Sequence, residues 1–307
     1  ALGDNFNSTL SWDNLNRSYY TGLYNASQEG DHSKYSYADG EGEWTGIRKA
    51  WIFLENIDRT PGMDQVEKDR LKGEAKMIIA CHYTDMYRHF GGLPLVRSSL
   101  TLENGKDIIE RATARETLKY ITDLCDEAYW VLPWALDEED VEVWDGRITG
   151  ATALGVKIRA LLFGASPLFN DSEPYRQSSG EANSKKLTWM GSKDMQLWYD
   201  LEEACKEFMT QLELQGGYNL VNTGKPRDDF RAGYFNRGTK EMLLSTRIRS
   251  NIPSNVWDGN YYFLQSATYY GALNPTLEYV DMFPMADGTE FDSEEFWKDP
   301  VTGEMLE

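Results

Sequence analysis

The stretch 146–170 constrains the fold of this chain more than any other. Ala153, Ala160 and Gly164 recur at spacings of seven and four, which places these small residues on one helix face that a second helix can approach closely. Apolar side chains cover most of the remaining circumference, and a helix of this kind lies inside a helical protein rather than on its surface. Because Pro167 disfavours helical backbone at the preceding residue, the helix is expected to end there. The sequence therefore predicts a buried central helix.

Amphipathic patterns indicate further helices on both sides of this segment. Their apolar residues recur at helical spacing, and Gly or Pro follows each pattern, as is typical of helix ends. Thr113 and Glu116 have the spacing of a capping box. The predicted helices cover residues 44–57, 64–90, 113–132 and 193–214. Helices joined in this way form antiparallel pairs, so we expect a mainly α protein with a tetratricopeptide-like array of helix pairs, although no clean repeat of that length is present.

The remaining segments predict loops and a few short strands. Residues 28–43 and 171–191 are polar and have no helical period, residues 1–27 carry the end of a helical pattern, and the apolar run 241–245 indicates a brief strand. From residue 249 to 284, aromatic residues alternate with Asn, Gly and Ser. We expect one domain over residues 1–307, with a helical scaffold mainly at 44–214 and a loop-rich part at 28–43 and 215–307.

The composition excludes several classes of protein. A net charge of −19 argues against binding a phosphate backbone, which requires clustered Lys and Arg, and against contact with anionic lipid. No window approaches the length of apolar chain that spans a membrane, and no secretion signal opens the sequence. Cys81, Cys125 and Cys205 have neither disulfide-framework nor zinc-site spacing, so we interpret them as inert thiols in helices.

No motif in the sequence indicates catalysis. The nucleophile elbow, the phosphate-binding loop and the dinucleotide fingerprint are missing. The acidic runs at 137–140 and 292–295 are interpreted as solvated loop charge, and the first of them lacks the ligand order of a calcium-binding loop. The three histidines are too scattered for a metal site, and His82 is interpreted as a satisfied core histidine. We therefore expect no enzyme, no metal and no cofactor.

Aromatic residues in the loops suggest a recognition site instead. The chain has 10 Trp and 18 Tyr, many of them in Gly- and Asn-rich segments. Sugars present apolar faces beside hydroxyls, so they require flat aromatic side chains surrounded by polar groups. The predicted ligand-binding residues are Trp257, Asp258, Asn260, Tyr261, Tyr262, Tyr269 and Tyr270, with Tyr35, Tyr37 and Asp39 as a second cluster. The alternative is that these side chains fix long loops onto the helices; for Trp44 and Trp51, which fall on a helical stripe, we favour a core position.

Five ordered motifs resemble the SusD/RagB family of outer-membrane nutrient-binding lipoproteins. Within them, Gly91-Gly92-Leu93-Pro94-Leu95-Val96 is similar to the best-known signature of the family, and the central segment ends in the related sequence Ala-Ser-Pro-Leu-Phe-Asn. The chain departs from the family at Trp51, where Asn is common. The motifs lie at residues 44–58, 73–96, 111–133, 146–170 and 274–288.

This resemblance implies a fold, a function and a location. The family has tetratricopeptide-like helix pairs with a loop-rich ligand-binding part, and it is not catalytic. Its members capture glycans at the extracellular face of the outer membrane and deliver them to a SusC-like TonB-dependent β-barrel transporter. Since family members are longer, the chain is expected to be the N-terminal part of a longer protein, with its signal peptide and lipidated Cys upstream of Ala1.

Two alternatives to a glycan-binding protein stay open. A helical-repeat protein of this architecture can bind a peptide or a protein partner instead of a glycan. A glycoside hydrolase is the least favoured, since a chain with 50 acidic residues contains accidental carboxylate pairs. A peptide binder loses affinity when its helix faces are altered, whereas a glycan binder loses it when loop aromatics are removed.

Overall fold

The structure, a computed structural model, describes residues 6–8, 42–100, 109–137, 144–177, 180–236, 238–245, 273–285, 287–291 and 302 of the 307-residue chain. The chain divides into two compact units, and we describe each by itself. One comprises residues 37–248, and the other comprises residues 1–36 together with 249–307. The expectation of a single domain stays a prediction.

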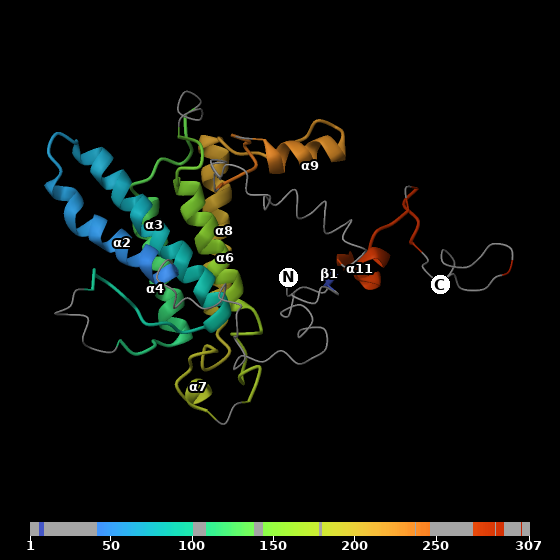
Figure 1. The fold of residues 1–307 in the computed structure, drawn as a ribbon, viewed down its shortest axis with the longest axis horizontal. Coiled ribbons are helices and arrows are strands. Elements are labelled where there is room, and N and C mark those ends of the chain that lie inside the picture. The colour runs from blue at the N-terminus through green and yellow to red at the C-terminus, as the bar shows by residue number, and fades with distance from the viewer. Residues whose placement is uncertain are drawn as a thin grey trace. The chain divides into compact units, whose positions relative to one another are not determined.

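The unit at 37–248 is helical among its described residues. Its long helices pack one on the next in chain order, from α2 through α3, α4 and α6 to α8, and α6 also contacts α3 (Figure 1). This arrangement confirms the prediction of a mainly α fold. The elements are α2 (Glu43–Asn56), the 3₁₀ helix η1 (Ile57–Arg59), α3 (Gln65–Phe90), α4 (Ala114–Tyr129), α6 (Gly150–Ala165), α7 (Glu181–Ser184), α8 (Gln196–Gln215) and α9 (Pro226–Phe235).

The described residues of the other unit form a small antiparallel pair of strands and a short helix. Strand β1 (Phe6–Ser8) pairs with β2 (Leu273–Pro275), with Asn7 opposite Asn274. Helix α11 (Leu277–Asp281) follows directly, and the hydroxyl of Thr276 accepts a hydrogen bond from the backbone N–H of Tyr279.

The helix ends follow the local signals in the sequence. The capping box of Thr113 and Glu116 is formed at the start of α4, as predicted. Gly91 ends α3 with a φ of 72°, a backbone conformation that favours glycine. A side chain at Gly91 would also collide with the backbone of Leu187, because its Cβ would lie 2.2 Å from that carbonyl oxygen. The turn after α3 therefore requires glycine for its conformation and for the close approach.

Helix α6 lies at the centre of the array, and its small residues explain why. Ala153 and Ala160 are fully buried, and α6 packs against α3, α4 and α8. A Cβ at Gly164 would lie 2.5 Å from Cδ2 of Leu118 on α4, so the helices could not approach as closely with any larger residue. The helix is not buried all round: Arg159 and Leu162 are exposed, and the side chain of Leu162 is 51% exposed.

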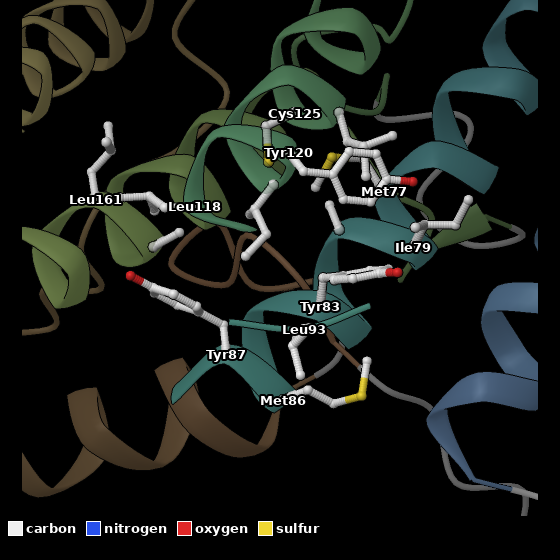
Figure 2. Close-up of a cluster of buried hydrophobic side chains, with 14 of the residues drawn as sticks. Met77, Ile79, Tyr83, Met86, Tyr87, Leu93, Leu118, Tyr120, Cys125 and Leu161 are labelled. Carbon is white, nitrogen blue, oxygen red and sulfur yellow. The ribbon is translucent and has the colours of Figure 1, made fainter. Parts of the chain in front are cut away.

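Side chains from three helices fix the extended segment that follows α3. The Tyr83 hydroxyl donates a hydrogen bond to the carbonyl of Pro94 (2.7 Å) and accepts one from the backbone N–H of Val96 (2.8 Å). The Val96 carbonyl in turn accepts hydrogen bonds from the Tyr120 hydroxyl (2.8 Å) and from the indole N–H of Trp51 (3.0 Å). At the position where the resembled family commonly has Asn, Trp51 thus supplies a side-chain N–H. Tyr83 and Tyr120 lie within the buried core (Figure 2).

One expectation about local structure was wrong. Residues 241–245 form no strand, and the side chain of Leu243 packs instead against a cluster that contains Trp134 and Leu154. Helix α9 lies in the part predicted to be rich in loops. Its signals are present in the sequence, since Pro226 occupies the first helical turn together with Asp228 and Asp229. The helical pattern expected within residues 1–27 lies outside the described residues.

Candidate ligand-binding site

The ten predicted ligand-binding residues lie outside the described residues. They comprise Tyr35, Tyr37 and Asp39 in the first cluster, and Trp257, Asp258, Asn260, Tyr261, Tyr262, Tyr269 and Tyr270 in the second. Their role in binding stays a prediction. Trp44 and Trp51, which we expected in the core, are partly buried and pack against it.

Within the helical unit, a cavity of about 570 Å³ opens beside the start of α6. It is bounded by the connection between α4 and α6, by the end of α8 and by the chain just before residue 246. A volume of this size lies within the usual range for small-molecule sites, roughly 300–1,000 Å³. Its lining includes Trp134, Asp137, Arg147, Gln215, Tyr218 and Lys240.

Two aromatic side chains form a fixed wall of this cavity. The rings of Trp134 and Tyr218 meet edge to face, with centroids 6.1 Å apart. The Trp134 indole N–H donates to the carbonyl of Gly216 (2.9 Å), and the Tyr218 hydroxyl lies 2.9 Å from that of Thr149. Burial raises the pKa of Tyr218, so this hydroxyl stays protonated at neutral pH. The Tyr218 position depends on Gly217, whose φ is 85° and whose Cβ would lie 2.8 Å from that of Ala135.

The start of α6 is tied to the cavity through its capping residues. The hydroxyls of Thr149 and Thr152 form a second capping box, which sequence reasoning did not identify because Thr replaces the usual Glu or Gln. The Thr152 hydroxyl also donates to the carbonyl of Leu243 (2.5 Å), which holds the chain after α9 against α6. The cavity wall is therefore rigid on the side of the central helix.

The charged groups of the cavity are of both signs. Arg147 is largely buried, and its guanidinium donates to the Glu74 carboxylate on α3 through Nε (2.8 Å). It also lies 4.8 Å from the centroid of the Trp144 ring, in a cation–π arrangement. Asp137 and Lys240 line other parts of the same cavity. Arg147 therefore acts mainly as a structural link between α3 and the segment before α6.

This arrangement is suited to binding a ligand that presents both apolar and hydroxyl surfaces. Aromatic faces provide flat contact area, while carboxylate, amide and ammonium groups can orient hydroxyls. Among the described residues, no group of three or more His, Cys, Asp or Glu side chains is arranged to hold a metal ion. His82, predicted to be a satisfied core histidine, contacts the Glu43 carboxylate and lies against Gly46.

Sequence reasoning did not identify this cavity. Pro133 and the Gly216-Gly217 pair were interpreted only as helix ends, and no role was assigned to Trp134 or Tyr218. One signal was available: Trp134 and Tyr218 each follow the end of a predicted helix, and the loops at helix ends often carry functional residues. Which two loops meet is decided by tertiary packing, so the pairing of Trp134 with Tyr218 was not predictable from spacing.

Solved structures provide the comparison that decides the fold. The chain is 22% identical to a SusD-like protein from Bacteroides fragilis NCTC 9343, with a TM-score of 0.63 over 93% of this chain and 49% of that chain. The chain has a SusD-like fold. It is also similar to a SusD-like carbohydrate binding protein from the same organism (17% identity, TM-score 0.55, 97% of this chain and 48% of that chain). A SusD homolog from Bacteroides thetaiotaomicron VPI-5482 matches with 20% identity and a TM-score of 0.50, over 71% of this chain and 36% of that chain.

The chain spans about half of the length of the first SusD-like structure that it matches. A scan of protein-family models gave no match to the sequence, and a search of curated proteins gave none either. In the part of the chain that the structure describes, every helix is too short or too polar to cross a membrane.

Proposed function

We propose that this chain is a non-catalytic cell-surface protein that captures an oligosaccharide or polysaccharide. The observation that carries the proposal is the SusD-like fold, which the chain shares with a structure described as a carbohydrate binding protein. Because one fold can host many functions, the argument also needs a site with suitable chemistry. The cavity beside Trp134 and Tyr218 provides flat rings next to polar groups, and around Trp257 the sequence itself alternates aromatic with polar residues.

The same reasoning extends to a partner and a location, both of which are part of the proposal. We infer that the glycan is delivered to a SusC-like TonB-dependent β-barrel transporter. The protein then resides at the extracellular face of the outer membrane, held by a lipid on an N-terminal Cys that this sequence does not include. The net charge of −19 agrees with a partner other than nucleic acid, whose recognition requires clustered Lys and Arg.

A helical-repeat protein that binds a polypeptide is the alternative, and one observation favours it. A second cavity of about 520 Å³ lies among α4, α6 and α8, away from the loop aromatics in the sequence. A glycoside hydrolase is the third reading, and it predicts release of reducing ends from the bound glycan.

Native gel electrophoresis in the presence of soluble polysaccharides tests the proposal. We expect one class of polysaccharide to retard the purified chain, with no new reducing ends in the same mixture. With that glycan, Trp257→Ala or Tyr262→Ala is expected to weaken binding by about 2 kcal/mol, the cost typical of removing an aromatic anchor. Trp198→Ala serves as the matched control, because this partly exposed Trp lies on α8 and lines neither cavity.

Other results would contradict the proposal in distinct ways. Retardation that survives both loop substitutions places the site elsewhere, and we would then test Lys240→Ala in the cavity beside Tyr218. Release of reducing ends by protein free of contaminating hydrolase would establish catalysis. Failure of every polysaccharide and oligosaccharide to bind, while a peptide binds, would favour the alternative.

A further inference from the structure

A groove crosses the helical unit where α4 and α8 flank α6. Its volume is about 520 Å³, and its lining comes from these three helices and from Trp130, the residue directly after α4. Leu154 and Leu161 of α6 and Ala204 of α8 contribute the apolar part of the lining. We call this feature the α4–α8 groove. It shares no lining residue with the cavity beside Trp134 and Tyr218. Leu154 lines the groove and also packs in the same hydrophobic cluster as Trp134.

The most exposed Trp among the described residues lies at this groove. The side chain of Trp130, at the end of α4, is 80% exposed and lines the groove. Its ring lies edge to face with that of Tyr129, at a centroid distance of 5.1 Å. An indole that is held in place by a neighbouring ring and left open to solvent is typical of binding surfaces, where Trp is enriched among the residues that dominate affinity.

Contacts between helices hold the groove in shape. The Tyr129 hydroxyl on α4 donates to the Glu207 carboxylate on α8 (2.8 Å), which also accepts a hydrogen bond from Gln211 (3.0 Å). On the other side, Lys157 of α6 forms an ion pair with Asp126 of α4 (2.6 Å). These links fix the separation of α4 and α8, so a ligand meets a preformed surface and loses less entropy on binding.

The charge of the groove determines the chemistry of its occupant. Four carboxylates line it, from Asp126, Asp200, Glu203 and Glu207, against a single ammonium from Lys157, and that ammonium is already paired. Such a surface attracts cations and repels anions. The face of Trp130 beside these carboxylates adds a favourable site for an ammonium or guanidinium group, because Trp is the best cation–π partner among the side chains.

We propose that the α4–α8 groove binds a basic segment of a partner protein, with an Arg or Lys side chain against Trp130. Carboxylates can accept hydrogen bonds from a neutral glycan, but the net negative charge of the groove favours only a cation, which is why we favour a cationic occupant. A groove of about 520 Å³ is also larger than a single small amine requires, and it suits a polypeptide segment with several basic side chains. The inference goes beyond glycan capture and does not rest on it.

The test uses the full chain and short fluorescein-labelled peptides in which Arg, Gln or Glu alternates with Ser, followed by fluorescence anisotropy. We expect the Arg peptide to bind, the Gln peptide to bind at least tenfold more weakly, and the Glu peptide not to bind. Affinity for the Arg peptide should fall as salt is raised, since the charges at the groove mouth are exposed to screening. Trp130→Ala should weaken it about tenfold, the size expected for loss of an interface anchor.

Two matched controls separate the groove from the general acidity of the chain. Asp200→Asn with Glu203→Gln removes two charges from the groove, whereas Glu202→Gln with Glu213→Gln removes two from positions on α8 that do not line it. We expect the first pair to weaken binding at least fivefold more than the second. Trp198→Ala is expected to leave the affinity within about twofold of the parent.

Circular dichroism of each variant establishes that its helices are intact before binding is measured. Equal effects of the two charge pairs, or an unchanged affinity after Trp130→Ala, would overturn the proposal. Equal affinity for the Arg and Gln peptides would also overturn it. Loss of retardation by a neutral glycan in Trp130→Ala, without any effect on the Arg peptide, would assign the exposed indole to sugar binding instead.

Discussion

Two buried tyrosines, one helical turn apart on α3, give opposite predictions for the same substitution. Tyr83 and Tyr87 are both fully buried, and Figure 2 shows their hydroxyls pointing in opposite directions. The Tyr83 hydroxyl makes two hydrogen bonds to the segment after α3, with Pro94 and Val96. The described residues offer the Tyr87 hydroxyl no hydrogen-bond partner. Substitution by Phe keeps the ring in both cases and therefore isolates the contribution of the hydroxyl.

The magnitudes follow from this difference. Tyr83→Phe removes two hydrogen bonds, each with a net contribution of about 1 kcal/mol, and leaves the buried Val96 N–H without its acceptor. We expect the free energy of unfolding to fall by about 2–3 kcal/mol. Tyr87→Phe removes a buried hydroxyl that was desolvated without compensation, so we expect no loss or a gain of up to about 1 kcal/mol.

Urea denaturation of the full chain, followed by far-UV circular dichroism, measures both effects. The denaturation midpoints should separate while the slopes stay equal, which indicates a change in stability rather than in the unfolded state. A loss for Tyr87→Phe as large as that for Tyr83→Phe would refute the reasoning. So would a Tyr83→Phe protein that is as stable as the parent.

Three further predictions concern packing, capping and thiol chemistry. Gly164→Ala should destabilise the protein by about 1–3 kcal/mol in urea denaturation, because its Cβ would overlap Leu118. Gly150→Ala on the same helix is the control: its Cβ meets nothing closer than 3.5 Å, so the change should be nearly neutral or mildly stabilising. Equal losses of stability would contradict the close packing of α6. Thr113→Ala should cost about 1 kcal/mol. Hydrogen bonds from Thr113 lower the pKa of Glu116, so the ionised carboxylate stabilises the folded protein. The difference in unfolding free energy between the parent and Glu116→Gln should be largest at pH values above the usual pKa of a carboxyl group, and it should shrink as the pH falls through the lowered pKa. A difference that grows in acid would contradict this. Burial raises the pKa of Cys81 to about 11, so an aromatic disulfide reagent at pH 8 should modify this thiol far more slowly in the native protein than in urea. Mass spectrometry of the peptide that contains Cys81 measures the two rates of modification. Equal rates would contradict the burial of this thiol.

The helices were predictable because their determinants are local. The capping pair of Thr113 and Glu116 and the positive φ of the glycines after α3 and α8 act within one or two turns. The small residues of α6 are recognised by their spacing along a single helix. The apolar period then indicates which face is buried, and Ala153 and Ala160 lie where it placed them. Four of the five motifs of the resembled family lie at α2, α3, α4 and α6, and the SusD-like fold agrees with them.

What could not be predicted depends on contacts between distant parts of the chain. The Val96 carbonyl is satisfied by Trp51 and Tyr120, which are 45 and 24 residues away. Residues 241–245 were predicted to form a strand, but a short apolar run does not distinguish a strand from other buried segments. The segment is held beside α6 instead, because the carbonyl of Leu243 accepts a hydrogen bond from Thr152.

The candidate sites were predicted in part. Sequence chemistry selected the aromatics around Trp257, which stay a prediction, and it did not find the wall made by Trp134 and Tyr218. The helical pattern over residues 113–132 gave no role to Trp130, so its exposed ring was not anticipated. In each case helical spacing identified the element, but exposure depended on which helix packs next to it.

Calorimetric titration tests glycan capture without turnover most directly. The full chain is titrated with an oligosaccharide prepared from the polysaccharide that retards it in the gel, and the ligand is recovered afterwards. Our account predicts a saturable heat of binding, and mass analysis should recover the oligosaccharide intact. The absence of binding to any oligosaccharide in the panel, or recovery of a shortened one, would contradict it.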